Sequence, residues 1–289
     1  MKIKILIPVY NDFQSASKLI VDINSVISNL NEEFSIIIIN DASTEKAEIN
    51  VSNIDKIKSV KIINMKENQG HARCIASGMK YIFDNDEFDY LIPMDGDGED
   101  RAEEISKFIE FLNYDKSKPI VGERVKRSEG LIFKLCYKFH KIITYVFTGQ
   151  SIKFGNYTCL HRSTVEKMIN EKATWSSFSG SLSKLEKNRS TIPSIRGERY
   201  FGPSKMSFYN LIKHSLSIIA VFKINVIIRS ILFYLIYLFL ISENITYITS
   251  IPLILVVIFV ISVLGISKRE NLDQLNNSLL NISNIDNLK

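Results

Sequence analysis

The sequence predicts an α/β fold, a mostly parallel sheet with helices on both faces, followed by two membrane-spanning helices. Three observations lead to this prediction. In the first half of the chain, short apolar runs alternate with stretches of helical periodicity. Polar motifs rich in Asp, Asn and Gly follow several of these runs. From Ile218 to Ile266, apolar residues dominate and charged residues are few.

The apolar runs predict buried strands, which are Ile3–Val9, Phe34–Ile39, Val60–Ile63, Tyr90–Met94 and a fifth that starts at Ile120. The stretches between them predict helices at Phe13–Leu30, Gly70–Phe83 and Ala102–Leu112. A continuous Ile run is typical of a strand that is covered on both faces. Alternating strands and helices indicate a parallel sheet with right-handed crossovers. Such sheets bind ligands beyond the carboxyl ends of their strands.

Residues 131–147 form a segment that is apolar, basic and rich in Phe and Tyr. This composition fits an interfacial helix that lies on a membrane surface. It equally fits an ordinary helix that packs against the rest of the domain.

Two later segments, Ile224–Ile241 and Ile248–Ile266, are long enough to span a bilayer. Basic residues flank the outer ends of this pair, whereas the link between the two segments has one acid and no base. The positive-inside rule therefore puts both ends in the cytoplasm. We expect an α/β domain at 1–210, a juxtamembrane helix with two membrane helices at 211–267, and a polar cytoplasmic tail at 268–289 that is a short helix or disordered.

Composition argues against several other classes of protein. The net charge of +5 is modest, and the basic residues do not gather on one element as in a nucleic-acid reader. Those that precede the membrane segments fit lipid headgroups, substrate phosphates or a solvated surface. The three cysteines are widely spaced without a CxxC pair, which indicates neither a zinc site nor a disulfide framework. The N-terminus does not match a signal peptide, and no GxGxxG follows the first strand as it would in a nucleotide-binding dehydrogenase.

The strongest chemical motif is Asp95-Gly96-Asp97, directly after a buried strand. Two carboxylates at this spacing offer hard oxygen ligands to Mg²⁺ or Mn²⁺, which complete their coordination with substrate phosphates. A cation bound to a diphosphate makes it a better leaving group. The alternative is a simple turn, because Asp and Gly favour turns.

Three other strand ends carry polar motifs. Asp41 ends the second strand, Pro8 to Asp12 end the first, and Asn68 to Arg73 precede a helix. Gly70 in the last motif lets the backbone approach a ligand closely. Because the carboxyl ends of parallel strands meet at one edge of the sheet, we expect these motifs to converge with Asp95 and Asp97.

Seven segments in order resemble those of a known family: PVYND at 8–12, NDAS at 40–43, NQGHA at 68–72, DGDGED at 95–100, GER at 122–124, GNYTCL at 155–160, and RxxRxxGxSK at 196–205. On these motifs, and on the two membrane segments after them, the chain resembles family 2 glycosyltransferases of the GT-A fold. Within that family it is similar to the polyprenyl-phosphate glycosyltransferases of the dolichyl-phosphate mannose synthase type. The resemblance covers roughly residues 1–266.

The resemblance implies roles for individual residues. Asp95 and Asp97 would hold Mg²⁺ or Mn²⁺ and act in catalysis with Asp100 and Arg199. The donor, a UDP- or GDP-sugar, would be bound by Asp95 together with Pro8, Tyr10, Asp12, Asp41, Asn68, Gly70, Arg73 and Arg124. The acceptor or its phosphate would be bound by Asn156, Arg196, Arg199, Ser204 and Lys205.

Three positions depart from the family pattern. Asn40 replaces the first acid of its motif, and Arg101 stands where a Pro is frequent. Asn156 replaces an Asp that is associated with activating or positioning the acceptor. An amide cannot act as a general base, but an acceptor phosphate is already anionic and needs little deprotonation.

The resemblance thus implies an inverting glycosyltransferase that moves a sugar to a polyprenyl phosphate at the cytoplasmic face of the cell membrane, with no nucleic-acid partner. Association into homo-oligomers through the membrane helices is a further expectation. Two alternatives stay open. The acceptor is a hydroxyl of a lipid-linked glycan or glycolipid, with Asp100 or Glu99 as the base; or the chain is an inactive membrane scaffold with the same fold.

Overall fold

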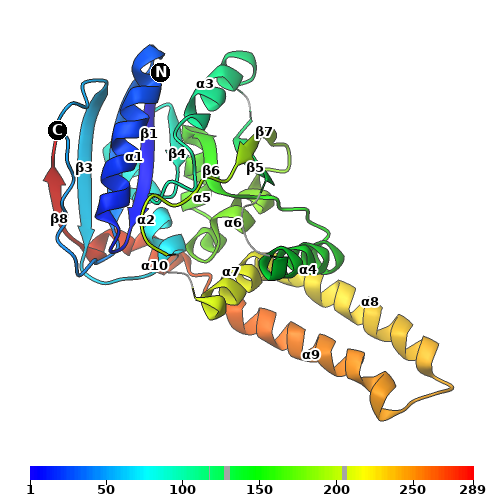
Figure 1. The fold of residues 1–289 in the computed structure, drawn as a ribbon. Helices are drawn as coiled ribbons and strands as arrows, with labels where there is room; N and C mark the ends of the chain where they lie inside the picture. The colour runs from blue at the N-terminus through cyan, green and yellow to red at the C-terminus, as the bar shows by residue number, and fades with distance from the viewer. Residues whose placement is uncertain (117, 127–130, 204–206) are drawn as a thin grey trace.

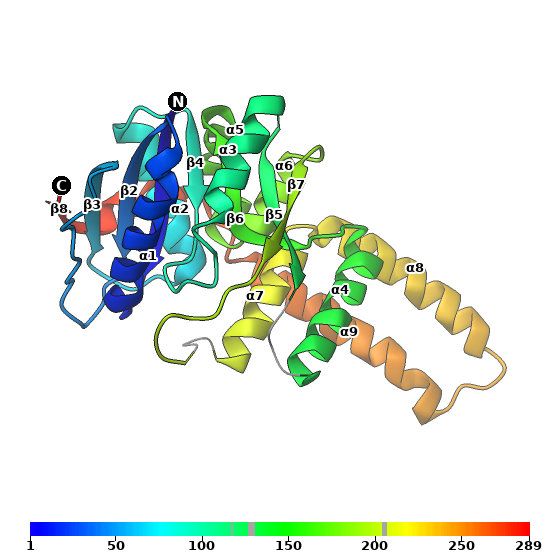
Figure 2. The same ribbon diagram turned by 45° about the horizontal axis from the view of Figure 1, so that its top comes forward.

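The computed structural model describes residues 1–116, 118–126, 131–203 and 207–289, and the side chains of 126 and 131–137 are outside that description. Within these ranges an eight-stranded sheet has the order β7-β5-β6-β4-β1-β2-β3-β8. Helices cover both of its faces, and a pair of long helices projects away from it (Figure 1; Figure 2). The predicted α/β fold class is therefore confirmed.

The first half of the sheet follows the prediction closely. Strands β1 (Lys2–Val9), β2 (Glu33–Asn40), β3 (Ile57–Met65) and β4 (Tyr90–Pro93) pair in parallel. Helices α1 (Phe13–Val26), α2 (His71–Asn85) and α3 (Glu104–Tyr114) connect or follow them, and a 3-10 turn (Ile27–Asn29) extends α1.

Alternate residues of β1 pack on opposite faces of the sheet. Ile3, Ile5 and Ile7 are buried with apolar residues of α1 and α3. Leu6 lies in a second core with residues of α2, α5 (Arg162–Ile169) and α6 (Phe178–Leu185). A strand buried on both faces needs a continuous apolar sequence, which explains why the Ile-rich runs predicted it.

The second half of the sheet is mixed. Strand β6 (Phe154–His161) runs antiparallel to both β4 and β5 (Ile120–Lys126), and β7 (Ser190–Ile195) runs parallel to β5. A 3-10 turn (Lys172–Trp175) separates α5 from α6. Because β6 runs the other way, its first residues lie at the edge where β1, β2 and β4 end. Asn156 thereby reaches the same edge as Asp95.

A second group of helices, which pack against one another, comprises α4 (Leu131–Thr148), α7 (Phe208–Ala220), α8 (Lys223–Ile241) and α9 (Tyr247–Ser267). The two predicted spans correspond to α8 and α9, which are long and apolar enough to cross a membrane. Large apolar side chains of both helices point outward, including Phe239 at 78% exposure. Exposure of so extensive an apolar surface is unfavourable in water, so these helices indicate a membrane protein.

Arg229 of α8 does not extend freely toward a bilayer surface. Its guanidinium donates hydrogen bonds to the carbonyls of Tyr145 (3.4 Å) and Val146 (2.9 Å) in the last turn of α4. Nearby, the Asn225 amide donates to the Thr148 carbonyl over 3.0 Å. A cation at a helix carboxyl end satisfies free carbonyls and complements the helix dipole. Arg229 therefore joins α4 to α8.

The tail after α9 returns to the sheet. It forms α10 (Leu272–Asn276), a 3-10 turn (Ser278–Asn281) and β8 (Ile282–Asn287), which pairs antiparallel with β3. The expectation of a short helix or a disordered tail at 268–289 is thus wrong for its last third. The physical reason is that β3 would otherwise present an unpaired edge.

The return of the tail also constrains the helix pair. One end of the pair follows α7, and the other end leads through α10 into the same sheet (Figure 1). Both ends of the α8–α9 hairpin therefore lie on the side of the catalytic domain.

Gly78 in α2 provides a test of the packing between α2 and the sheet. A Cβ at this position would lie 2.5 Å from Leu6 Cδ1 and 2.8 Å from Ile39 Cγ1. We expect Gly78→Ala to destabilise the protein by about 1–3 kcal/mol, because overpacking outweighs the better helix propensity of Ala. The measurement is thermal unfolding in detergent. Gly265→Ala in α9, where the new Cβ would meet no atom outside its own helix backbone within 4 Å, is the control and should leave stability unchanged or raise it slightly.

Candidate active site

The polar motifs converge at the carboxyl ends of β1, β2 and β4. Val9 of β1 pairs with Asn40 of β2, and Asn40 pairs with Asn64 of β3, so these strands end at the same level. The loops that follow carry Asp12, Asp41 and the 95–100 segment. Interactions of their side chains, described below, join these loops into one polar site.

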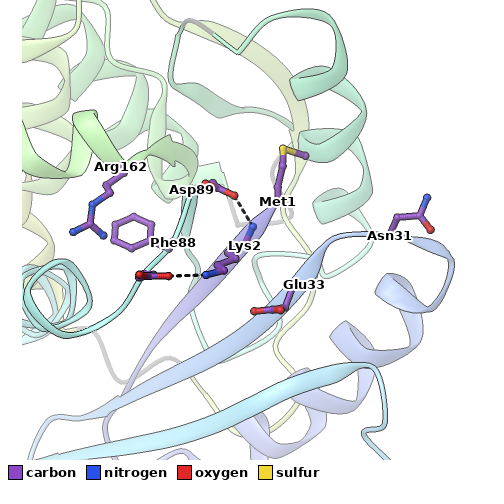
Figure 3. Close-up of a pocket in the computed structure, with 8 residues that line it drawn as sticks. Met1, Lys2, Asn31, Glu33, Phe88, Asp89 and Arg162 are labelled. Atoms are coloured by element: carbon purple, nitrogen blue, oxygen red, sulfur yellow. Dashed lines mark hydrogen bonds and ion pairs between the residues drawn. The ribbon is translucent and has the colours of Figure 1, made fainter.

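A hollow at the opposite edge of the sheet is distinct from this site (Figure 3). It lies at the amino ends of β1 and β2 and is lined by Met1, Lys2, Asn31, Glu33, Glu87, Phe88, Asp89 and Arg162. The Lys2 ammonium pairs with Glu87 over 2.7 Å, and the Lys2 backbone N–H donates to Asp89 over 2.7 Å. In a parallel sheet the chemistry is expected at the other edge.

Three aspartates, Asp95, Asp97 and Asp100, follow β4 within six residues, together with Glu99. The backbone N–H of Asp95 donates to Asp100 Oδ2 over 2.9 Å, and that of Glu99 donates to Asp97 Oδ1 over 3.0 Å. Gly98 between them has φ +88°, a conformation that favours glycine. The turn therefore bends back on itself and holds all three carboxylates close together.

Cationic side chains from other elements surround this cluster. His71 Nε2 at the start of α2 lies 3.2 Å from Asp95 Oδ1, and Arg124 Nη2 of β5 lies 3.8 Å from Asp100 Oδ1. Arg199, in the segment after β7, donates to Asp97 and also to Asp12 Oδ2 over 2.8 Å. The positive groups thus come from three separate parts of the chain.

The balance of these charges decides the protonation of the cluster. Burial opposes ionisation of Asp95, but His71, Arg124 and Arg196 outweigh it, so the pKa of Asp95 is lowered. Burial, and then the charge on Asp95, raise the pKa of Asp97 to about 6. The same two causes raise the pKa of Asp100 to about 7. Negative charge is therefore crowded here, and an added cation would relieve the crowding.

The segment after β7 docks onto the Asp95–Asp100 turn. The Tyr200 N–H donates to the Asp97 carbonyl and the Gly197 N–H to the Glu99 carbonyl, both over 2.9 Å. The Arg196 guanidinium pairs with the Glu99 carboxylate. This segment thereby places Arg199 between Asp12 and Asp97. Ser204 and Lys205, predicted to bind phosphate, lie outside the described residues.

Asp41 forms hydrogen bonds that stabilise a second loop, residues 68–70. Its carboxylate accepts hydrogen bonds from the N–H groups of Gln69 and Gly70, both over 2.9 Å, and the Asn68 amide donates to its carbonyl over 3.0 Å. Burial nevertheless raises the pKa of Asp41, because it outweighs these bonds. Gly70 has φ +89°, which the turn into α2 requires.

Comparison with known proteins identifies the family. A model described as glycosyl transferase family 2 matches residues 4–178. The chain belongs to this family. Undecaprenyl-phosphate 4-deoxy-4-formamido-L-arabinose transferase of Salmonella choleraesuis is 29% identical over 221 residues, which cover 73% of this chain and 64% of that protein. The chain thus matches somewhat less than two thirds of the length of this relative.

Solved structures of glycosyltransferases share the fold. Glucosyl-3-phosphoglycerate synthase from Mycobacterium tuberculosis, in complex with Mn²⁺, UDP and phosphoglyceric acid, superposes with a TM-score of 0.56 at 11% identity over 78% of each chain. The mannosyltransferase PcManGT from Pyrobaculum calidifontis, in complex with GDP-Man and Mn²⁺, gives a TM-score of 0.51 at 11% identity and covers 96% of this chain and 74% of its own. At this identity the likeness shows the GT-A fold alone.

For this family 2 protein, the predicted site residues fall into two groups. The structure brings together Asp12, Asp95, Asp97, Asp100, Arg124, Asn156, Arg196 and Arg199 in two sets of ion pairs and hydrogen bonds that meet in the Asp95–Asp100 turn. Asp41, Asn68 and Gly70 form the adjoining loop. Arg73 does not face either group, because its guanidinium stacks on the Trp175 ring at 5.3 Å. Tyr10 is 44% exposed, and Pro8 pairs with Ile39 within the sheet.

His71 is a site residue that the sequence argument left out of its main set. Its Nε2 lies 2.7 Å from the Asn156 amide and 3.2 Å from Asp95. Burial disfavours the imidazolium, but Asp95 raises the pKa of His71 overall. A proton on Nε2 would be donated to Asp95, whereas an unprotonated Nε2 would accept from the Asn156 amide. Its place next to Gly70 was the only signal in the sequence.

The raised pKa of Asp100 predicts a pH-dependent stability. Because its pKa rises from 3.8 in the unfolded chain to about 7 in the fold, ionisation destabilises the folded state as pH rises through this window. Asp100→Asn keeps an acceptor for the Asp95 N–H and removes the charge. In EDTA at pH 8 we expect it to raise the unfolding temperature by at least about 3 °C, the shift that roughly 1 kcal/mol produces.

At pH 4 the same variant should gain nothing, since wild-type Asp100 is then protonated. Asp84→Asn, at an exposed position of α2, is the matched control. An equal gain at both pH values would mean that burial of this charge is not the cause.

Proposed function

We propose that the protein is a membrane-bound inverting glycosyltransferase that moves a sugar from a nucleoside-diphosphate sugar to a polyprenyl phosphate at the cytoplasmic membrane face. The observation that carries this proposal is the crowded Asp95–Asp97–Asp100 cluster, matched by arginines and placed beside a membrane hairpin. Membership of family 2 supports the transfer reaction. The name of the Salmonella relative supports the lipid phosphate as acceptor.

A divalent cation fits the cluster. Among the described residues, no three His, Cys, Asp or Glu side chains form a complete metal site. Asp95 and Asp97 would therefore hold Mg²⁺ or Mn²⁺ with the help of donor phosphates, as is usual for Mg²⁺. The cation would offset charge on the departing diphosphate. In the structure Arg199 neutralises Asp97, and the raised pKa values of Asp97 and Asp100 mark the charge that a cation would balance.

The donor nucleotide would occupy the loops after β1 and β2. Asp12, Asp41 and the Asn68–Gly70 segment surround this position, and Tyr10 offers an exposed ring on which a base can stack. Either a UDP-sugar or a GDP-sugar fits this proposed position. The proteins of similar fold from Mycobacterium tuberculosis and Pyrobaculum calidifontis are in complex with UDP and GDP-Man, respectively.

The acceptor phosphate would bind among Arg124, Arg196 and Arg199, where charge-assisted hydrogen bonds are strong. Its oxygen attacks the anomeric carbon directly, and the configuration inverts. No base is required, which is consistent with Asn156 as an amide beside Asp95, 3.5 Å from its Oδ1.

The alternative is a hydroxyl acceptor. One observation favours it, since a pKa of about 7 would suit Asp100 as a general base. However, Asp100 is 3% exposed and accepts the Asp95 N–H, so it is not free to reach a substrate hydroxyl. Glu99 is held by Arg196. The phosphate acceptor is therefore the preferred reading. An inactive scaffold would have no need for so strongly crowded a cluster of charges.

The membrane arrangement follows from several features. Helix α4 exposes Phe139, Ile142 and Tyr145 beside Lys138 and Lys141, as an interfacial helix would. Both ends of the α8–α9 hairpin lie on the catalytic side, and the basic residues at its outer ends favour the cytoplasm. Association of copies through these helices remains part of the proposal.

The reaction is tested by transfer of radiolabelled sugar from UDP- and GDP-sugars to undecaprenyl phosphate, with Mg²⁺ or Mn²⁺ and with EDTA. We expect metal-dependent labelling that Asp97→Ala lowers by at least about 100-fold, because a ligand of the cation is lost. Glu110→Ala, an exposed acid on α3, is the control. Labelling that persists in EDTA and in Asp97→Ala would remove the metal from the proposal.

The Asn156→Asp variant tests whether the acceptor group is a phosphate or a hydroxyl. With a phosphate acceptor no base is needed, so we expect kcat/KM for undecaprenyl phosphate to stay within about threefold of wild type. With a hydroxyl acceptor, the new carboxylate would supply a base, and kcat/KM for that acceptor would rise by roughly tenfold or more. Asn170→Asp, an exposed position after α5, controls for the added charge.

A further inference from the structure

The C-terminal tail contacts the loops that the proposed function assigns to the donor nucleotide. Two lines of hydrogen bonds lead from the tail to these loops. One starts at Asn281 and reaches the Asn68–Gly70 segment. The other starts at Asp286 in β8 and crosses three strands toward the loop after β1.

The first line depends on the side-chain amide of Asn281. Its Oδ1 accepts the Glu67 N–H over 3.1 Å, and its Nδ2 donates to the Glu67 carbonyl over 2.9 Å. The Asn281 carbonyl also accepts the Lys66 N–H over 2.7 Å. The Asn281 amide thus pairs with both the N–H and the carbonyl of Glu67, as a neighbouring strand would. The next three residues, Asn68 to Gly70, bind Asp41.

The second line runs across the carboxyl ends of the strands. The Asn64 amide donates to Asp286 Oδ2 over 2.8 Å, and the Asn40 amide donates to Asn64 Oδ1 over 2.8 Å. Asn40 Oδ1 then accepts the Ser43 N–H over 2.9 Å. Ser43 Oγ accepts the Asn11 N–H over 2.9 Å. The line therefore joins β8, β3 and β2 to the loops that hold Asp12 and Asp41.

Asp286 fixes which groups donate and which accept along the second line of hydrogen bonds. A carboxylate can only accept, so Asn64 must turn its NH₂ toward Asp286 and its oxygen toward Asn40. Residue 40 must then donate, which an amide can do and a carboxylate cannot. An amide at position 40 therefore continues the line, whereas a carboxylate would interrupt it.

We propose that Asn281 and Asp286 are positioning residues that hold the nucleotide-binding loops in shape from the C-terminal tail. The proposal rests on the assignment of these loops to the donor. Since the tail follows α9, the loops are complete only when the chain has passed through the membrane hairpin and returned.

The Asn281 contact is tested with Asn281→Ala in the full-length protein. We expect the KM for the sugar nucleotide to rise by roughly three- to tenfold, as the loss of two hydrogen bonds would produce, with kcat within about twofold of wild type. Amide hydrogen exchange of Gln69 and Gly70 should become faster. Asn287→Ala, an exposed position at the end of the following strand β8, should leave both unchanged.

These readouts separate the two proposals. If wild-type protein transfers no sugar, the proposed function fails, while hydrogen exchange still tests the contact. If exchange at Gln69 and Gly70 is the same in Asn281→Ala and wild type, Asn281 does not position the loop and this inference is wrong.

Variants that exchange the donor and acceptor roles along the second line test this arrangement. Asn40→Asp should raise the donor KM, because Asn64 must flip and turn its oxygen toward Asp286. Adding Asp286→Asn supplies a donor to that oxygen and should restore the KM to within about twofold of wild type. Adding Asp286→Ala removes the same charge without a donor and should not restore it. Equal rescue by both second changes would indicate a charge effect and overturn the proposed line.

Discussion

The balance of charge around Asp95, Asp97 and Asp100 is the constraint on which the candidate site depends. The three aspartates within one turn repel each other, and burial makes that repulsion stronger. The fold compensates with His71 from α2, Arg124 from β5 and Arg199 from the segment after β7. Each of these elements must be correctly placed for the turn to be stable, so the site and the fold depend on each other.

The same balance suits a reaction that handles diphosphates and phosphates. Arg199 bridges Asp97 and Asp12, which belong to different strand ends. A cation with a sugar nucleotide would take over the neutralisation of Asp97 and free Arg199 for phosphate oxygens. Such an exchange of partners would keep the charge on Asp97 balanced both before and after substrates bind.

The membrane helices and the sheet are tied together at two places. Arg229 and Asn225 join α8 to the carboxyl end of α4. On the other side of the hairpin, the indole N–H of Trp175 donates to Gln274 in α10 over 2.8 Å, and β8 then pairs with β3. These contacts orient the carboxyl edge of the sheet relative to the hairpin, so a lipid-borne acceptor would meet a site of fixed geometry.

The sequence by itself determined the parallel strands from Ile3 to Met94, the helices between them, the two apolar spans and the Asp95–Asp97 motif, because local periodicity and buried apolar runs encode them. Only the tertiary structure decided that β6 reverses, that the polar tail supplies β8, that Arg73 stacks on Trp175, and that His71 faces Asp95. These features depend on pairing between segments far apart in the chain. A short polar strand such as β8 carries no apolar pattern of its own, and its position is set by the open edge of β3.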